Sequence, residues 1–221
     1  MNLKKIVTLL LVLCLVFFML TGCTGSDQPT GSNTENTTEV AQGVTNDKIL
    51  IGNSAATSGV FAPIGLPFIH GIEAYLEYVN LQGGIDGRKV EFVHYDDGFD
   101  PATTAQYLEK LVYEDKVFAI VGHFGSPCIA ATLPDLEEIG IPAVYFAGGV
   151  LDLYSEDDPD RNIYPVQPIY PYEGKIMAAY AAGHFKAKNV AIIYTNNEAG
   201  INTYEGILEQ LNQYNEVEVV S

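Results

Sequence analysis

One short stretch of the chain combines glycines, a hydroxyl side chain and a helix start, which together can hold an anion. Residues 122–126, Gly-His-Phe-Gly-Ser, follow an apolar segment at 117–121 that reads as a buried strand, and Ser126-Pro127 is typical of a helix N-terminus. The glycines let a ligand approach the backbone, and Ser126 offers a hydroxyl. The first helical turn offers free N–H groups and the positive end of the helix dipole. We expect a carboxylate to bind here, beyond the end of the strand. The alternative is that Ser126 only caps its helix.

A second polar stretch, His94-Tyr95-Asp96-Asp97, is a candidate for metal binding or acid–base chemistry. Paired acids beside a histidine can bind a hard cation or share a proton. However, alternation along a strand sends His94 and Tyr95 to opposite faces, and the acids lie in a turn before a helix start, so structural turn chemistry is the better explanation. Residues 122–126 also contain neither a Walker lysine nor a Gly-x-Ser-x-Gly elbow. The sequence therefore predicts a non-enzyme with no catalytic residues, no metal and no cofactor.

The N-terminus has the pattern of an export signal. Two lysines precede an apolar run, residues 6–20, that is too short for a stable membrane span. The run ends in Leu20-Thr21-Gly22-Cys23, which matches the lipobox of bacterial lipoproteins and implies cleavage before Cys23 and a diacylglycerol on its sulfur. We predict a signal peptide at 1–22 and a lipid anchor at Cys23 without a transmembrane helix. An ordinary signal peptide with a chance cysteine is the alternative.

Composition separates a polar linker from a globular body. Residues 23–45 are mostly Ser, Thr, Asn, Gly, Pro and Gln, which predicts a disordered tether. The net charge of −17 argues against nucleic acid and against anionic lipid surfaces as partners. Once Cys14 is removed with the signal and Cys23 is acylated, Cys128 has no partner, so no disulfide framework can form.

From residue 46 onward, short β-rich runs alternate with amphipathic helical segments, which is typical of parallel α/β architecture. We expect strands at 49–53, 90–95, 117–121 and 141–146, and helices at 67–81, from Asp100 and from Ser126, with Pro134 restarting the last helix. After an irregular crossing at 147–172, we expect helices at 173–186 and 201–214, and strands at 189–194 and from 216. These elements predict a first lobe at 46–167 and a second, incomplete lobe at 168–221, so the sequence reads as an N-terminal fragment.

The body also carries a series of short motifs, at 48–52, 57–59, 61–65, 78–80, 83–89, 95–101, 111–112 and 121–122. In their order and spacing they resemble the type I periplasmic binding proteins of the branched-chain amino acid uptake group. The resemblance runs from about Lys48 to Val220 and is strongest up to Ala147. It implies a two-lobed receptor, with a parallel sheet flanked by helices in each lobe. Such a receptor closes on a small ligand and delivers it to the permease and ATPase subunits of an ABC importer.

The resemblance also implies which residues contact the ligand. Ser126 matches the family position that holds a ligand carboxylate, and Gly125 and Phe124 lie next to it. Ala147 matches a position whose backbone carbonyl takes the ligand ammonium, and Gly149 matches one where the family often has threonine, so that hydroxyl is absent here. Phe124, Tyr145 and Phe146 are candidates for apolar walls, and the alternative is that they belong to the core, as aromatic residues on buried strands more often do. The implied ligand is an amino acid or a related small carboxylate.

Two functions follow from this resemblance. The first is a lipid-anchored capture protein of an ABC importer on the outer face of the cytoplasmic membrane, in an extracellular or periplasmic location. The second is a ligand-sensing domain of the same fold that passes its closure to a signalling partner. A sensor of that kind continues into a membrane helix and an output region, whereas an importer receptor ends soon after its second lobe.

Overall fold

The computed structural model describes residues 41–154 and 162–220, in which five parallel strands form one sheet. The strand order is β2 (Lys89–Asp96), β1 (Lys48–Ala55), β3 (Ala119–Val121), β4 (Ala143–Val144) and β5 (Ile163–Tyr164). The longest pairing joins β1 to β2, in register from Lys48 opposite Lys89 to Ala55 opposite Asp96. The predicted parallel α/β fold is therefore present.

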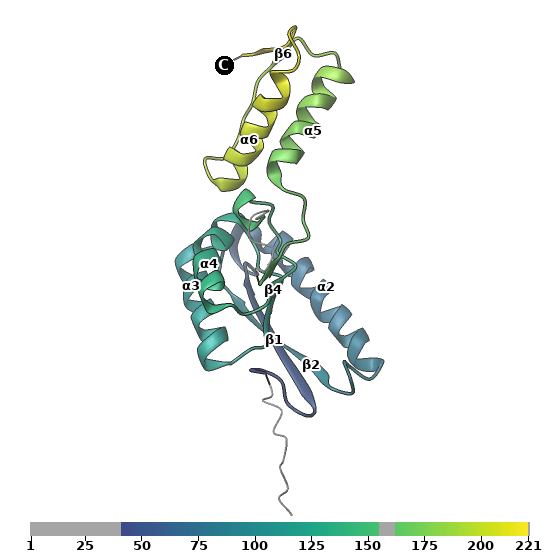
Figure 1. The fold of residues 1–221 in the computed structure, drawn as a ribbon, viewed down its shortest axis with the longest axis vertical. Helices are drawn as coiled ribbons and strands as arrows, with labels where there is room; N and C mark the ends of the chain where they lie inside the picture. Colours follow the sequence, from purple (N-terminus) through teal and green to yellow (C-terminus); the bar gives the residue numbers. More distant parts are fainter. Residues whose placement is uncertain (1–40, 155–161, 221) are drawn as a thin grey trace, which may run out of the picture. The chain divides into compact units, whose positions relative to one another are not determined.

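The two faces of this sheet are covered by different helices (Figure 1). Helix α2 (Ala62–Leu81) lies on one face. Helix α3 (Pro101–Glu109), which continues into a π turn at Lys110–Glu114, lies on the other face with α4 (Ser126–Ile139). Strand β3 shows why, because Ile120 packs with the α3 and α4 residues while Ala119 and Val121 pack on the α2 side. Successive side chains of a strand point to opposite faces, so an apolar strand needs helices on both.

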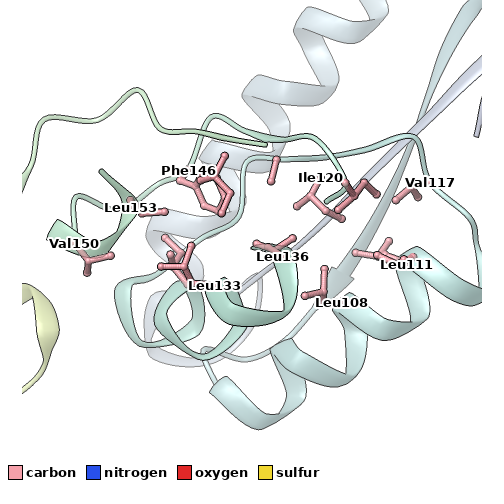
Figure 2. Packing of buried hydrophobic residues seen from close by; sticks show 14 residues of the cluster. Leu108, Leu111, Val117, Ile120, Leu133, Leu136, Phe146, Val150 and Leu153 are labelled. Atoms are coloured by element: carbon pink, nitrogen blue, oxygen red, sulfur yellow. The ribbon is translucent and has the colours of Figure 1, made fainter. Parts of the chain in front are cut away.

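The largest cluster of buried residues lies between the sheet and the α3–α4 layer. Figure 2 shows Leu108 and Leu111 facing Leu133 and Leu136, and Ile120 of β3 lies above them. Phe146, Val150 and Leu153 extend the cluster beyond β4, and Leu153 belongs to a short 3-10 turn, Leu151–Leu153. The largest buried cluster of this unit therefore depends on α3, α4 and the segment after β4.

Two proline-based predictions of helix boundaries are wrong. Helix α2 begins at Ala62, after a 3-10 turn at Gly59–Phe61, and Pro67 lies inside it rather than at its start. Likewise, α4 runs unbroken through Pro134 instead of restarting there. A proline inside a helix removes one backbone hydrogen bond. In α4 the neighbouring residues Leu133 and Leu136 are buried in the core, and this packing outweighs the loss.

Several strands are shorter than predicted, and one was not foreseen. The expected strands at 117–121 and 141–146 reduce to β3 and β4, and the expected strand at 189–194 reduces to β6 (Asn189–Val190). Strand β5 falls in the segment that was expected to be irregular, and it extends the first sheet by pairing with β4. Apolar side chains continue beyond the hydrogen-bonded pairs, so hydrophobicity alone overestimates strand length.

The later part of the chain forms a smaller α/β unit. Helices α5 (Tyr170–Gly183) and α6 (Glu198–Leu211) pack together around Ala178, Ala182, Ile207 and Leu211. Strand β6 pairs in parallel with β7 (Glu218–Val219) as a two-stranded sheet.

The N-terminal expectations fall mostly outside the described residues, including the signal peptide at 1–22, the lipid site Cys23 and the tether as far as residue 40. Residues 41–45 belong to the folded part, because the Gln42 side-chain amide donates to the carbonyls of Val112 and Val117, at 3.0 Å each. The ordered body therefore begins before residue 46.

By length and composition alone, residues 59–81 could cross a membrane. In the fold, Ile69 of α2 is buried against Ala55, Ala56 and Phe124, and Leu76 and Val79 pack on the sheet. The same apolar residues therefore serve as the inner face of a helix in a layered α/β unit.

Candidate ligand-binding site

The loops after β3 and β4 meet at the carboxyl edge of the sheet and bring four of the predicted site residues together. Phe124 and Ala147 form a parallel bridge. The Gly125 N–H donates to the Ala147 carbonyl at 3.2 Å, and the Ala147 N–H donates to the His123 carbonyl at 2.8 Å. A carbonyl has two lone pairs, so the Ala147 oxygen can accept one further hydrogen bond. The edge where open parallel sheets bind ligands is thus occupied by the predicted residues.

Ser126 is the first residue of α4, and Gly125 is the N-cap. The sequence interpretation of Ser126 as the cap is therefore wrong. Gly125 has a positive φ of 93°, a conformation that glycine adopts without a steric penalty, and it has no side chain to cap the first turn. The Ser126 side chain is buried, and its Oγ lies 3.2 Å from the Tyr170 hydroxyl. The start of α4 thus combines a hydroxyl with the unpaired N–H groups of a first helical turn.

Gly149, the remaining predicted site residue, lies against the chain that leads into α5. Its carbonyl accepts a 2.8 Å hydrogen bond from the Tyr170 N–H. A Cβ atom at Gly149 would lie 2.3 Å from the Pro168 carbonyl oxygen, so a threonine does not fit in this backbone arrangement. Gly149 itself supplies no hydroxyl. The residue whose N–H binds its carbonyl, Tyr170, has a hydroxyl that lies 3.2 Å from Ser126 Oγ.

Sequence reasoning missed three residues of this region, namely Tyr170, Phe99 and Phe61. A signal for Tyr170 was available, because a proline is typical of the first turn of a helix and Pro171 follows Tyr170, the first residue of α5. Phe99 lies within the 95–101 motif, but nothing in the motif indicates that its ring turns toward Gly125. A Cβ atom at Gly125 would be 2.4 Å from Phe99 Cε2, so the ring covers this glycine.

The acids of the second polar stretch hold loop backbones. Asp96 accepts hydrogen bonds from the N–H groups of Thr57, Ser58 and Gly98, at 2.9, 3.2 and 3.1 Å. Asp97 accepts from the Phe99 N–H at 2.9 Å and from the Thr104 hydroxyl at 3.1 Å. Burial raises the pKa of Asp97 above its ordinary value, although these hydrogen bonds oppose the rise. Both carboxylates therefore position the loops around the site, as structural turn chemistry predicts.

His94 belongs to a hydrogen-bonded chain that crosses β2, β1 and the loop after β3. The Asn53 side-chain amide donates to the Gly122 carbonyl at 2.8 Å, so its oxygen faces His94 Nδ1, also at 2.8 Å. His94 Nε2 lies 3.1 Å from the Thr57 hydroxyl. Because the Asn53 oxygen can only accept, Nδ1 carries the proton in the neutral ring and Nε2 accepts from Thr57. Burial lowers the pKa of His94, although the charges of Asp96 and Asp97 oppose this.

Two further groups near the start of α4 are buried in unreactive forms. His123 is fully buried, and burial lowers its pKa to about 4, so the ring is neutral at pH 7. Its Nε2 lies 3.0 Å from the Thr132 hydroxyl. Burial raises the pKa of the Cys128 thiol to about 11, which leaves it protonated and poorly nucleophilic. Across residues 41–154 and 162–220, no group of three His, Cys, Asp or Glu side chains is placed to hold a metal ion. The groups gathered at this edge are thus hydrogen-bond donors, acceptors and aromatic rings, which suit binding.

The chain is similar in sequence to known proteins of one family. The family model described as periplasmic binding protein matches residues 48–220. An amino acid binding protein of Pseudomonas aeruginosa is 28% identical over 175 residues, which cover 78% of this chain and 46% of that protein. The chain thus spans about half the length of the curated relatives it matches.

Solved structures show the same fold. A fatty acid ABC transporter substrate-binding protein from Thermomonospora curvata is similar with a TM-score of 0.71 and 23% identity, over 82% of this chain and 45% of that one. A branched-chain amino acid transporter substrate-binding protein from Streptococcus pneumoniae, solved with isoleucine, gives a TM-score of 0.66 and 25% identity, over 79% and 48%. The parallel sheet and the family match lead to one assignment. The chain belongs to the periplasmic binding protein family.

Proposed function

We propose that this chain forms the ligand-capturing part of an extracytoplasmic receptor for an ABC importer, and that its ligand is a small carboxylate such as an amino acid. The observation that carries the proposal is the start of α4. Ser126 places its hydroxyl at the first turn, and the glycine N-cap leaves the N–H groups of that turn without a side-chain cap. Helix N-termini favour anions through free N–H groups and the helix dipole.

The neighbouring backbone supports an amino acid or a related compound. The Ala147 carbonyl lies beside Gly125 and keeps a lone pair that a ligand ammonium can use. The names of the relatives agree in chemistry, since amino acids, isoleucine and fatty acids all carry a carboxyl group. The role is capture rather than catalysis, because the ionisable groups near the site hold loops or are buried and neutral.

Partners and location follow from the same proposal. A receptor of this family passes its ligand to a permease that is driven by an ATPase, so these two subunits are the proposed partners. The lipobox Leu20–Cys23 supports a diacylglycerol anchor at Cys23, which holds the receptor on the outer face of the cytoplasmic membrane.

The test is calorimetric titration of the natural full-length protein and its Ser126→Ala variant with L-amino acids and simple carboxylates. A hydrogen bond to a charged group contributes about 1.5–3 kcal/mol, so the variant should bind a carboxylate ligand roughly ten- to a hundredfold more weakly. The amide of the same ligand serves as the matched control, because it lacks the charge and should lose little affinity in the variant. Unchanged affinity of the variant for the carboxylate would overturn the assignment of Ser126.

A further inference from the structure

Three aromatic rings from three different loops meet at the carboxyl edge of the sheet. Phe61 follows β1, Phe99 follows β2 and Phe124 follows β3. The rings of Phe61 and Phe99 stack, with centroids 3.7 Å apart and planes at 22°. Phe99 meets Phe124 edge to face, with centroids 5.9 Å apart and planes at 67°. The edge-to-face contact of Phe99 with Phe124 lies within the preferred range for aromatic pairs, whereas Phe61 and Phe99 lie closer together than is usual for a stacked pair.

This aromatic cluster, Phe61, Phe99 and Phe124, lies directly beside the candidate carboxylate site. The Phe99 ring covers Gly125, where a Cβ atom would approach Phe99 Cε2 to 2.4 Å. Gly125 is followed by Ser126, so the ring lies one residue away from the proposed carboxylate donor. Phe124 is buried, whereas Phe61 and Phe99 are only half-buried. Part of the surface of each of these two residues therefore remains exposed.

The position of Phe99 is maintained against the preference of its own backbone. Its φ is 68°, in the left-handed region that side-chain-bearing residues avoid. Asp97 holds this conformation, because its carboxylate accepts the Phe99 N–H at 2.9 Å and its carbonyl accepts the Asp100 N–H at 3.0 Å. Strained residues that the surrounding structure holds in place are concentrated at ligand sites. The strain here places an aromatic ring over the start of α4.

We infer that Phe99 and Phe61 are specificity-determining residues, and that the ligand is a carboxylate that bears an aromatic ring. The inference rests on the proposed carboxylate-binding function. With the carboxylate at Ser126, the remainder of a small ligand lies within reach of the Phe99 ring, which covers the adjacent glycine. A phenyl ring can join the stacked and edge-to-face arrangement, whereas a saturated ring of similar size makes only van der Waals and hydrophobic contact.

The experiment compares matched ligands in the natural full-length protein by calorimetric titration. The probe pairs are L-phenylalanine with L-cyclohexylalanine, and phenylacetate with cyclohexylacetate. Aromatic contacts add to burial, so the wild type should bind the aromatic member of a pair about three- to tenfold more tightly than the saturated member. The saturated rings are the more hydrophobic, so a preference for phenyl reports ring–ring contact rather than burial alone.

Variants then locate the preference. Phe99→Leu and Phe61→Leu each keep an apolar side chain but remove one ring. In each variant, the ratio of the affinities for the aromatic and the saturated ligand should fall toward one. Two variants from separate loops are used so that misfolding of one does not decide the result. Phe118→Leu is the matched control, because Phe118 is 37% exposed and precedes β3, at the opposite end of that strand from the site. It should keep the full preference.

Three results would overturn the inference: equal or tighter binding of the saturated members by the wild type, an unchanged preference in both leucine variants, or no binding of either aromatic acid at millimolar concentration. The proposed function fails differently, when no carboxylate of any kind binds or when Ser126→Ala leaves carboxylate affinity unchanged. If an aliphatic acid binds through Ser126 and phenyl and saturated rings bind equally well, the specificity role of the aromatic cluster is overturned, while the proposed carboxylate site stands.

Discussion

The hydroxyl of Ser126 lies 3.2 Å from the hydroxyl of Tyr170, although 44 residues separate them in the sequence. The contact joins the first turn of α4 to the first residue of α5, and the Tyr170 N–H binds the Gly149 carbonyl in the same region. Tyr170 therefore has the position of a residue that orients Ser126 toward a ligand.

Replacing Tyr170 by phenylalanine should weaken carboxylate binding about two- to tenfold, since a typical hydrogen bond contributes about 0.5–1.5 kcal/mol. Tyr172→Phe, an exposed tyrosine on the same helix, is the matched control and should bind normally. Calorimetric titration measures both. The positioning role also requires that Tyr170→Phe add little to Ser126→Ala in a double-mutant cycle, and additive losses would contradict it.

The lipobox predicts that Cys23→Ala abolishes lipid attachment. Cells fed an alkyne-tagged fatty acid should label the wild type but not the variant, and the variant should leave the detergent-extractable membrane fraction. Cys128→Ala, which removes the buried thiol, should still be labelled. Membrane retention of the Cys23 variant at the wild-type level would rule out the lipid anchor.

Two glycines of α2 should respond oppositely to alanine. A Cβ atom at Gly65 would lie 1.9 Å from the Ala56 carbonyl oxygen, whereas one at Gly71 would meet nothing within 4 Å. Gly65→Ala must push the helix away from Ala56, the residue after β1, and should lower the free energy of unfolding by about 2 kcal/mol or more. Gly71→Ala should raise it by up to about 1 kcal/mol through higher helix propensity. Denaturant titration compares the two, and equal effects would contradict the close contact at Gly65.

Buried His123 should make the protein less stable as the pH falls from 7 to 5. Its pKa is about 4 in the folded state against an ordinary value of 6.5, so in this range the unfolded chain takes up a proton that the folded chain does not. Unfolding is then favoured by about 2 kcal/mol more at pH 5 than at pH 7. His123→Gln removes this group while the other titrating groups remain, so its stability should fall less over the same interval. Identical pH dependence in the two proteins would show that His123 is not buried as a neutral ring.

Cys128 should resist alkylation in the native protein, because its side chain is buried and burial raises the pKa of the thiol to about 11. Iodoacetamide at pH 8 should label it only after unfolding in denaturant, when the pKa returns to its ordinary value. Mass spectrometry of the two samples measures this. Rapid native labelling would indicate that α4 opens locally.

The alternation of apolar strands and helices could be predicted from the sequence because it depends on local periodicity. Ile120 is an example, since it lies in an apolar run that was expected to be a strand and is buried in β3. Phe146 could not be assigned the same way. It was a candidate for a ligand wall, yet it is 1% exposed and packs in the core (Figure 2). An aromatic residue at the end of a strand suits either role, and only the packing of the segment after β4 decides between them.

The part of the candidate site that depends on residues close together in the sequence could be predicted. The glycines and the helix start at 122–127 carry their signal within a few residues, so Gly125, Ser126 and their approach to Ala147 follow from the strand order. Tyr170 and Phe99 depend on non-local contacts or on an unusual backbone conformation. A left-handed φ at Phe99 is set by Asp97, and no propensity of phenylalanine indicates it.

The chain of hydrogen bonds from Thr57 through His94 and Asn53 to Gly122 gives the site a natural spectroscopic reporter. The amide orientation of Asn53 fixes the proton on His94 Nδ1, so the two ring nitrogens should have well-separated nitrogen-15 chemical shifts in the neutral ring. One end of the chain is the loop that leads to Phe61, and the other is the glycine loop that leads to Ser126. A ligand that moves either loop must alter this imidazole resonance, even though the ring itself need not touch the ligand.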